Sequence, residues 1–119
     1  MCSSDLDANG RQGEARTADV LDLEPLGAKF TAFGWQVIEI HGHDIPSIRT
    51  ALRRAAATGD RPTIIVARTV KGAGVSFMAD VQRWHGSLAP TPDELAAACA
   101  ELDAASAAAA AQHAGGGFY

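Results

Sequence analysis

Thr63-Ile64-Ile65-Val66-Ala67 is the stretch of sequence that decides the fold of this chain. Apolar and β-branched residues follow one another there without the alternation expected of a strand that has one face in water. A continuous run of this kind, introduced by Pro62, is typical of a parallel strand that is buried on both faces. We therefore predict an inner strand over residues 63–67.

The sequence directly upstream of this strand predicts a helix. Asp44 is a suitable N-cap residue, and Pro46 falls in the first turn, where proline is tolerated. The tripeptide Thr58-Gly59-Asp60 ends the helix. One apolar face is expected from residues at helical spacing, namely Ile48, Ala51, Leu52 and Ala55.

A second helix and a second strand precede this pair. Asp22 is the predicted N-cap of the helix, and Gly34 ends it. The apolar face of this helix is predicted from Leu26, Phe30 and Phe33. Residues 35–40 then favour a strand, and residues 41–44 a loop.

Downstream of the inner strand, residues 70–90 show no clear period and predict a long loop. Long loops inside compact domains are often functional. Thr91-Pro92-Asp93-Glu94 is a capping box with proline at the first helical position, so another helix is predicted to begin there. The alanine-rich residues 104–111 fit either a frayed helix or a disordered segment.

The alternation of strands and helices predicts an α/β fold with a doubly wound parallel sheet and right-handed crossovers. Only two or three strands are visible, so we expect a partial sheet whose remainder lies on further sequence or another chain. Residues 1–6 are expected to be a truncated or non-native start. Residues 7–103 are expected to form one domain, and residues 104–119 a low-complexity tail.

Composition excludes several classes of function. Hydrophobic residues make up 47% of the 119 residues and charged residues 20%, which is a globular composition. The formal net charge of −4, with dispersed basic residues, argues against nucleic-acid binding. Cys2 and Cys99 show neither metal-ligand spacing nor a disulfide framework, which favours a reduced, cytoplasmic compartment. We expect no membrane span and no secretory signal.

Three segments should lie beyond the carboxyl ends of the strands, where open α/β sheets bind ligands, and parallel connectivity puts them on one edge. They are residues 7–11, 41–44 and 71–85. Asn9 offers an amide oxygen of the kind that Mg²⁺ takes as a ligand, and Lys71 beside two glycines suits a phosphate. The imidazole of His85 could donate a hydrogen bond to a phosphate or to a substrate hydroxyl.

Each of these residues also has a plain structural interpretation. An asparagine before glycine is most often a turn residue, a lysine beside glycines is usually part of a surface loop, and a loop histidine is more often solvated or packed. His41 and His43 are expected to be structural. The residues taken one by one leave these alternatives open.

Taken together, the motifs resemble the second half of the cofactor-binding domain of transketolases, and most of all the short, split bacterial forms whose N-terminal subunit is a separate chain. The resemblance runs from residue 7 to about residue 102. It rests on Asp7-Ala8-Asn9-Gly10-Arg11-Gln12, Asp22-Leu23-Glu24-Pro25-Leu26, Ala32-Phe33-Gly34-Trp35 and Gly42-His43-Asp44. The most specific motif is Thr69-Val70-Lys71-Gly72-Ala73-Gly74-Val75-Ser76-Phe77-Met78, followed by Trp84-His85-Gly86.

The resemblance implies a thiamine-diphosphate-binding fold, with thiamine diphosphate held through Mg²⁺ or, in its place, Ca²⁺ or Mn²⁺. Asn9 would ligate the metal through its side chain, and Arg11 through its backbone carbonyl. Lys71 would lie near the cofactor. His85 would contact the diphosphate and the donor sugar and would act in catalysis. The implied reaction transfers a two-carbon ketol unit from a ketose phosphate to an aldose.

The chain departs from the family pattern because a Gly-Asp-Gly segment, which carries a metal carboxylate, is absent. We therefore expect the chain to be inactive alone and to need a pyrimidine-domain, C-terminal transketolase subunit, in an oligomer when complete. Two alternatives stay open. One is another thiamine-diphosphate enzyme, such as a deoxyxylulose-phosphate synthase or a sulfo-sugar or apulose-type ketol transferase. The other is a non-catalytic α/β remnant or interaction module.

Overall fold

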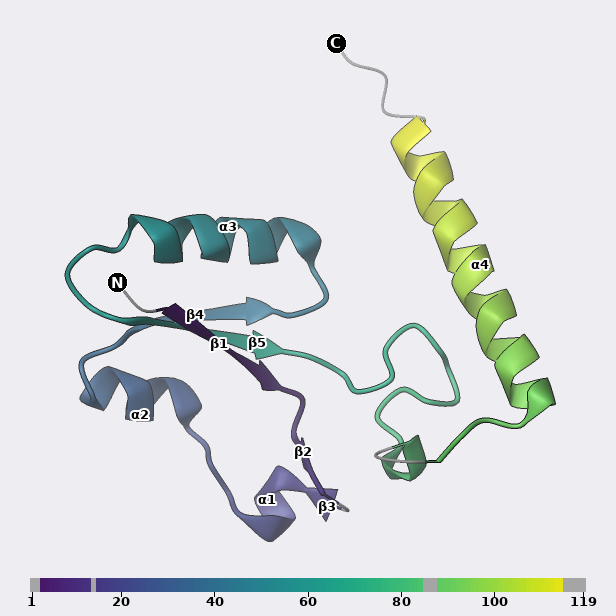
Figure 1. Ribbon diagram of the computed structural model, residues 1–119, viewed down its shortest axis with the longest axis horizontal. Coiled ribbons are helices and arrows are strands. Elements are labelled where there is room, and N and C mark those ends of the chain that lie inside the picture. Colours follow the sequence, from purple (N-terminus) through teal and green to yellow (C-terminus); the bar gives the residue numbers. More distant parts are fainter. Residues whose placement is uncertain (1–2, 14, 85–87, 115–119) are drawn as a thin grey trace. The chain divides into compact units, whose positions relative to one another are not determined.

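The computed structural model describes residues 3–13, 15–84 and 88–114, with the side chains of 112–114 left out (Figure 1). The chain divides into two compact units, Met1–Val70 and Lys71–Tyr119. The first contains a parallel sheet with helices, and the second contains a long loop and a long helix. His85 and residues 115–119 lie outside the described part of the chain.

The sheet of the first unit has three parallel strands in the order β1-β5-β4. They are β1 (Ser3–Ala8), β4 (Gln36–His41) and β5 (Thr63–Arg68). Residues 63–66 are all buried, and Val66 has no exposed surface. The inner strand predicted from the continuous apolar run is therefore confirmed, and it is the centre of the sheet.

Helix α2 (Leu26–Ala32) packs on one face of this sheet and α3 (Ile45–Ala57) on the other (Figure 1). The chain passes from β1 across to β4 and then returns to β5, so its direction across the sheet reverses. Two crossovers of the same hand must then lie on opposite faces. The predicted α/β class, with a partial doubly wound parallel sheet, is confirmed.

The core between α3 and the sheet is small, and alanines of the helix form its outer layer. Ala51 and Ala55 pack on Ile38 of β4 and Ile65 of β5. Small side chains at positions i and i+4 let the helix approach the strands closely. Leu52, predicted for this face, is 55% exposed, so that part of the prediction is wrong. It follows Ala51 by one position and therefore lies about 100° round the helix.

The start of α3 agrees with the prediction. The carboxylate of Asp44 accepts a hydrogen bond from the Ser47 N–H at 3.1 Å, and proline occupies the first turn. This contact satisfies one of the main-chain donors that a helix leaves unpaired at its N-terminus. Thr58 stands at the C-cap, where the end of the helix was expected.

The start of α2 differs from the prediction. Asp22 was the expected cap, but its carboxylate accepts from the Glu24 N–H at 3.0 Å, in a turn before the helix. Glu24 instead accepts from the N–H of Leu26, the first helical residue, at 2.9 Å. Glu24, two residues before the helix, therefore satisfies the first main-chain donor of α2, while Pro25 stands at the N-cap without a side-chain hydrogen bond.

Short elements between β1 and α2 were not predicted. Strands β2 (Arg11–Gln12) and β3 (Ala15–Arg16) form an antiparallel pair, and α1 (Thr17–Val20) follows. Elements of two to four residues are too short to leave a periodic signal in the sequence.

The second unit consists of a loop, a 3₁₀ turn η1 (Gln82–Trp84) and helix α4 (Pro92–Ala114). The capping box is confirmed, because Glu94 accepts from the Thr91 N–H at 2.8 Å and donates its own N–H to the Thr91 hydroxyl at 3.2 Å. The alanine-rich residues 104–111 are helical. None of the described helices has both the length and the apolar character needed to cross a membrane.

Candidate functional site

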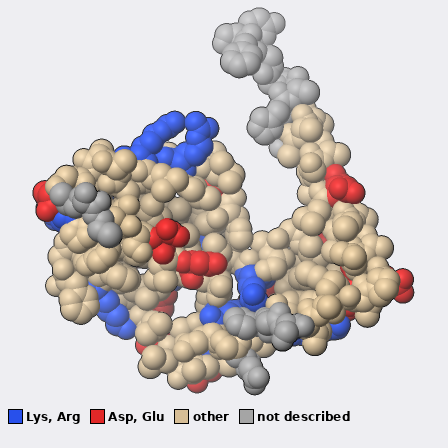
Figure 2. Space-filling model, viewed as in Figure 1, with Lys and Arg blue, Asp and Glu red and all other residues tan. Residues whose placement is uncertain are grey.

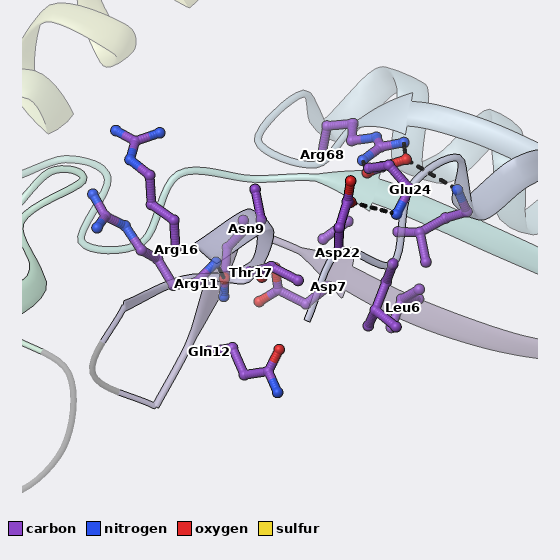
Figure 3. A pocket seen from close by; sticks show the side chains of 15 residues that line it. Leu6, Asp7, Asn9, Arg11, Gln12, Arg16, Thr17, Asp22, Glu24 and Arg68 are labelled. Atoms are coloured by element: carbon purple, nitrogen blue, oxygen red, sulfur yellow. Dashed lines mark hydrogen bonds and ion pairs between the residues drawn. The ribbon is translucent and has the colours of Figure 1, made fainter. Parts of the chain in front are cut away.

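A cavity of about 390 Å³ opens in the first unit where β1 and β5 end (Figure 3). The strand ends are level, since Ala8 of β1 and His41 of β4 both pair with Arg68 of β5. The residues after β1, the segment before α2 and Arg68 line the cavity. Its position beyond the carboxyl ends of parallel strands is that of ligand sites in open α/β sheets.

Asn9 lines this cavity in a tight turn. Its side-chain oxygen accepts a hydrogen bond from the Arg11 N–H at 2.9 Å, and the side chain is half-buried. Such a turn is the plain role that the sequence left open. An amide oxygen has two lone pairs, so one remains for a further partner. Gly10, with φ of 72°, adopts the left-handed conformation that the turn requires.

Two further contacts join the loops that leave the strands. Asp7 of β1 accepts from the hydroxyl of Thr69, directly after β5. The Val70 N–H donates to Nε2 of His43, in the loop after β4, at 2.7 Å. In this arrangement the His43 side chain is the acceptor for a main-chain N–H. A structural role for His43 is what the sequence suggested.

Gly42 allows the loops after β4 and β5 to approach each other. Its N–H donates to the Arg68 carbonyl oxygen at 2.8 Å. A Cβ at this position would collide with the Thr69 methyl group and lie 3.1 Å from the Ala67 Cβ. The absence of a side chain at residue 42 is therefore needed for the chain after β4 to approach the end of β5 this closely.

Arg68 holds the wall of the cavity through two carboxylates. It forms an ion pair with Glu24, which precedes α2 (Figure 3). It forms a second ion pair with Glu39 of β4 at 3.3 Å. The hydrogen bonds from Arg68, followed by that from the Leu26 N–H, lower the pKa of Glu24 to about 2. Glu24 is thus ionised at neutral pH and keeps the segment before α2 against β5.

Gln12 offers the cavity an acceptor that is not in use. The residue lines the cavity, and its side-chain oxygen is buried without a hydrogen-bond partner among the residues that the structure describes. A buried acceptor of this kind costs free energy unless a ligand or water donates to it. The buried oxygen of Gln12 therefore favours a polar ligand or a water molecule in the cavity.

Lys71 begins the second unit, in a loop shaped by two glycines. Gly72 and Gly74 have φ of 75° and 99°, which other residues rarely adopt. Trp84 packs edge-on against Phe77, with ring centroids 5.7 Å apart, and donates from its indole nitrogen to the Phe77 carbonyl oxygen at 3.2 Å. The backbone conformation of the loop after Lys71 therefore requires glycine at residues 72 and 74, which are also part of the sequence motif.

The predicted site residues are brought together only in part. Asn9 and Arg11 share the cavity of the first unit. Lys71 belongs to the second unit, and His85 lies outside the described residues. The meeting of Asn9, Lys71 and His85 at one site therefore stays a prediction.

No individual role in the site was predicted for Asp7, Gln12, Arg68 or Glu24. The position of Asp7 could have been inferred from the sequence. Side chains two residues apart in an extended segment point to the same side, and Asp7 precedes Asn9 by two residues. Arg68 and Glu24 had none, since their ion pair spans 44 positions. Figure 2 shows basic and acidic side chains in small separate groups on the face it draws, so no dominant charged surface directs attention to either residue.

The fold and the cavity define an α/β domain that binds a ligand at the carboxyl edge of a parallel sheet. The family model of the transketolase thiamine diphosphate binding domain matches residues 7–107. The chain therefore belongs to the transketolase family, in the part that forms the thiamine-diphosphate-binding domain.

Curated relatives agree with this assignment. Over 97 residues the chain is 33% identical to one of the subunits of the apulose-4-phosphate transketolase of Phocaeicola vulgatus, a match that covers 82% of this chain and 34% of the relative. It is 36% identical over 97 residues to the 6-deoxy-6-sulfo-D-fructose transketolase subunit SqwG of Clostridium sp. (strain MSTE9), covering 82% and 35%. It is 39% identical over 71 residues to the human transketolase-like protein 2, covering 60% and 11%. The chain thus spans about a third of the length of the first two relatives.

The described residues fit a part of a metal–diphosphate site. The Asn9 amide and the Arg11 carbonyl belong to one turn at the cavity, and oxygen donors of this kind suit Mg²⁺. No group of three or more His, Cys, Asp or Glu that could hold a metal occurs among the described residues. The turn can therefore contribute ligands to a cation whose other ligands come from the cofactor, from water or from residues outside the described part.

Proposed function

We propose that this chain is part of a transketolase that transfers a two-carbon ketol unit from a ketose phosphate to an aldose, with Mg–thiamine diphosphate bound at the cavity. The observation that carries the proposal is the Asn9–Arg11 turn, which lines a cavity at the carboxyl edge of the parallel sheet. Family membership supplies the cofactor, and the turn supplies the place for its cation.

The roles proposed for the residues follow from their chemistry. The Asn9 side-chain oxygen and the Arg11 carbonyl would hold Mg²⁺, and Ca²⁺ or Mn²⁺ would accept the same oxygens. Lys71 would neutralise the diphosphate, and His85 would contact the diphosphate and the donor sugar and move a proton at the sugar hydroxyl. Bound thiamine diphosphate supplies the nucleophilic carbon and the electron sink for breaking a carbon–carbon bond.

We further propose that the chain is inactive alone, because Mg²⁺ demands six oxygens in near-octahedral geometry and the turn provides two. A pyrimidine-domain subunit would complete the site in an oligomer acting on sugar phosphates in the cytoplasm. Support comes from two relatives that are named as subunits of transketolases.

Calorimetric titration of the chain with Mg²⁺ and thiamine diphosphate tests the incompleteness of the site. We expect a dissociation constant weaker than about 10 μM, which corresponds to roughly −7 kcal/mol. Tighter binding would show that the site is complete in this chain and would refute this part of the proposal.

The catalytic part is tested by mixing the chain, extended upstream to include a Gly-Asp-Gly segment, with a complementary pyrimidine-domain subunit. We expect ketol transfer, and we expect Asn9→Ala to weaken the apparent affinity for Mg²⁺. Arg16→Ala, which changes another residue of the cavity wall without removing a proposed ligand, is the matched control. Persistent inactivity of the extended mixture would count against the proposal.

A second candidate keeps the cofactor and changes the sugar. It is favoured by the names of two relatives, one an apulose-4-phosphate transketolase and one a 6-deoxy-6-sulfo-D-fructose transketolase. A deoxyxylulose-phosphate synthase belongs to the same class of alternative. Side-by-side assays of the completed enzyme with these donors and with a common ketose phosphate would separate the possibilities.

A third candidate is a non-catalytic α/β module. It is favoured by the hydrogen bonds that already engage the Asn9 side-chain oxygen and the Asp7 carboxylate within the protein. It predicts that Asn9→Ala lowers the stability of the chain without changing any affinity for Mg²⁺. The magnesium titration of the extended mixture decides between this candidate and the first.

A further inference from the structure

Residues 71–80 form a loop whose two ends are joined by a main-chain hydrogen bond. The Asp80 N–H donates to the Lys71 carbonyl oxygen at 2.8 Å, and the Val75 N–H donates to the Gly72 carbonyl oxygen at 3.3 Å. The structure describes the whole loop, and Val75 is its one buried residue. Phe77, Met78 and Ala79 are half-buried beside it. A segment with a single buried side chain depends in part on polar contacts for its order.

Glu101 of α4 supplies such a contact. Its Oε2 accepts from the Ser76 N–H at 2.6 Å, and its Oε1 accepts from the Ser76 hydroxyl at 2.7 Å. Both polar hydrogens of Ser76 therefore go to a single carboxylate. Hydrogen bonds to an ionised acceptor are about twice as strong as those between neutral groups. The hydroxyl, and then the N–H, of Ser76 lower the pKa of Glu101, so these bonds favour the ionised carboxylate.

The neighbouring residue of α4 meets the same loop. A Cβ on Gly74 would lie 3.2 Å from the Leu102 Cδ2, and Gly74 has φ of 99°. A side chain there would be strained by the backbone and crowded by the helix. Helix α4 thus contacts the loop at two successive positions, one polar and one apolar, on either side of Val75.

The helix that presents Glu101 is itself anchored within the second unit. Its capping box fixes its first turn. Arg83 of η1 forms an ion pair with Glu94 at 2.9 Å and lies 4.6 Å from the centre of the Trp84 ring. The segment that follows the loop is therefore tied to the first turn of α4, and Glu101 lies about two turns further along.

We propose that Glu101 is a positioning residue, which fixes the loop that carries Lys71 by binding both polar hydrogens of Ser76. The inference rests on the proposed function for what Lys71 does, since a lysine held on an ordered loop meets a diphosphate with less loss of conformational freedom. Whether Glu101 keeps the loop ordered does not depend on the role of Lys71, and it can be measured without any cofactor.

Amide hydrogen exchange of the full chain, followed by NMR, tests the dependence of the loop on Glu101. Glu101→Ala should accelerate exchange of the Asp80 amide by about tenfold or more, because local opening no longer breaks charge-assisted bonds. Amides of β5, such as that of Val66, should keep their wild-type rates. Alanine favours helix, so α4 should persist.

Two matched variants separate positioning from a general effect. Asp103→Ala removes the same charge from an exposed position of α4 and should leave the Asp80 amide unchanged. Glu101→Gln keeps an acceptor for the Ser76 N–H and a donor for its hydroxyl, and should restore most of the protection. Exchange of the Asp80 amide within twofold of wild type in Glu101→Ala would overturn the proposal. Equal acceleration in the β5 amides would also overturn it.

A second measurement addresses Lys71 directly. Inorganic pyrophosphate with Mg²⁺ is titrated at millimolar concentrations, and the Lys71 amide resonance is followed. Glu101→Ala should need at least about threefold more ligand than wild type for the same shift, because the loop is no longer pre-ordered. Equal titrations would contradict the positioning role. If wild-type Lys71 does not respond, the assignment of Lys71 under the proposed function fails, and the exchange rates alone decide the role of Glu101.

Discussion

Arg68 is the residue that connects the sheet to the segment in front of α2. Its contact with Glu24 spans the cavity wall, and it lowers the pKa of Glu24 from an ordinary value of about 4.5 to about 2. A carboxyl group whose pKa is depressed by folding stabilises the native state above its unfolded pKa. That contribution should be lost as the pH falls from about 4.5 through about 2. Both groups are largely exposed, so the effect on stability is small.

The pKa itself is the sharper observable at this position. In Arg68→Met, we expect the pKa of Glu24 to return most of the way to 4.5, because the hydrogen bonds from Arg68 are its largest cause. A ¹³C carboxyl titration by NMR measures it. Arg61→Met, which breaks another exposed arginine–carboxylate pair, is the control and should leave Glu24 unchanged. An unchanged Glu24 titration in Arg68→Met would show that the ion pair is not formed in solution.

Gly42 is a second residue with a testable requirement. A Cβ there would collide with Thr69 and would lie 3.2 Å from the Arg68 carbonyl oxygen. Gly42→Ala should therefore destabilise the first unit by about 1–3 kcal/mol, as overpacking does. Gly59→Ala is the matched control, because a Cβ at Gly59 has open space and its backbone is unstrained. Urea unfolding compares the two variants, and equal midpoints would contradict the packing argument.

At the scale of the element, β5 is the strand that pairs with both of its neighbours and contributes most of the buried residues of the sheet. Val66 has no exposed surface, so Val66→Ala should cost about 2 kcal/mol through lost burial and a cavity. Val20→Ala changes the same side chain where it is 55% exposed, and should cost less than about 0.5 kcal/mol. Urea unfolding followed by Trp35 fluorescence, in a Trp84→Phe background, reports on the first unit. Similar costs for the two valines would show that β5 is not the centre of the core.

Elements with a strong local cause could be predicted from the sequence. The continuous apolar run predicted β5, Asp44 with Pro46 predicted the start of α3, and the Thr91–Glu94 capping box predicted the start of α4. Each signal resides in residues close together in the chain. The predicted cap of α2 was wrong because the helix begins at Leu26, so Asp22 lies too early in the chain and Glu24 accepts from the first helical N–H instead.

The candidate site was predictable where it depends on one turn and hidden where it depends on the fold. The Asn9–Arg11 turn lies beyond a strand end, as the order of elements implied. The contacts that shape its surroundings join distant residues: Asp7 with Thr69, and Arg68 with Glu24. Pairs of this kind leave no spacing that a single sequence could reveal.

At the scale of the whole molecule, the division at residue 70 separates the proposed metal turn from the loop of Lys71. The two units are stabilised by different kinds of interaction. The first relies on apolar burial around β5, and the second on polar contacts between a glycine-shaped loop and α4. The proposed chemistry needs both units. The magnesium titration of Asn9→Ala therefore tests the first unit, and the pyrophosphate titration of the Lys71 amide tests the second.

The order β1-β5-β4 has a consequence for how the chain comes to be folded on the ribosome. In the described part of the chain, β1 and β4 pair with β5 and not with each other, yet β5 is the last of the three to be synthesised. Neither β1 nor β4 can make the pairings described here until residue 68 has left the exit tunnel. Formation of these pairings therefore waits for β5, and it joins residues that are far apart in sequence.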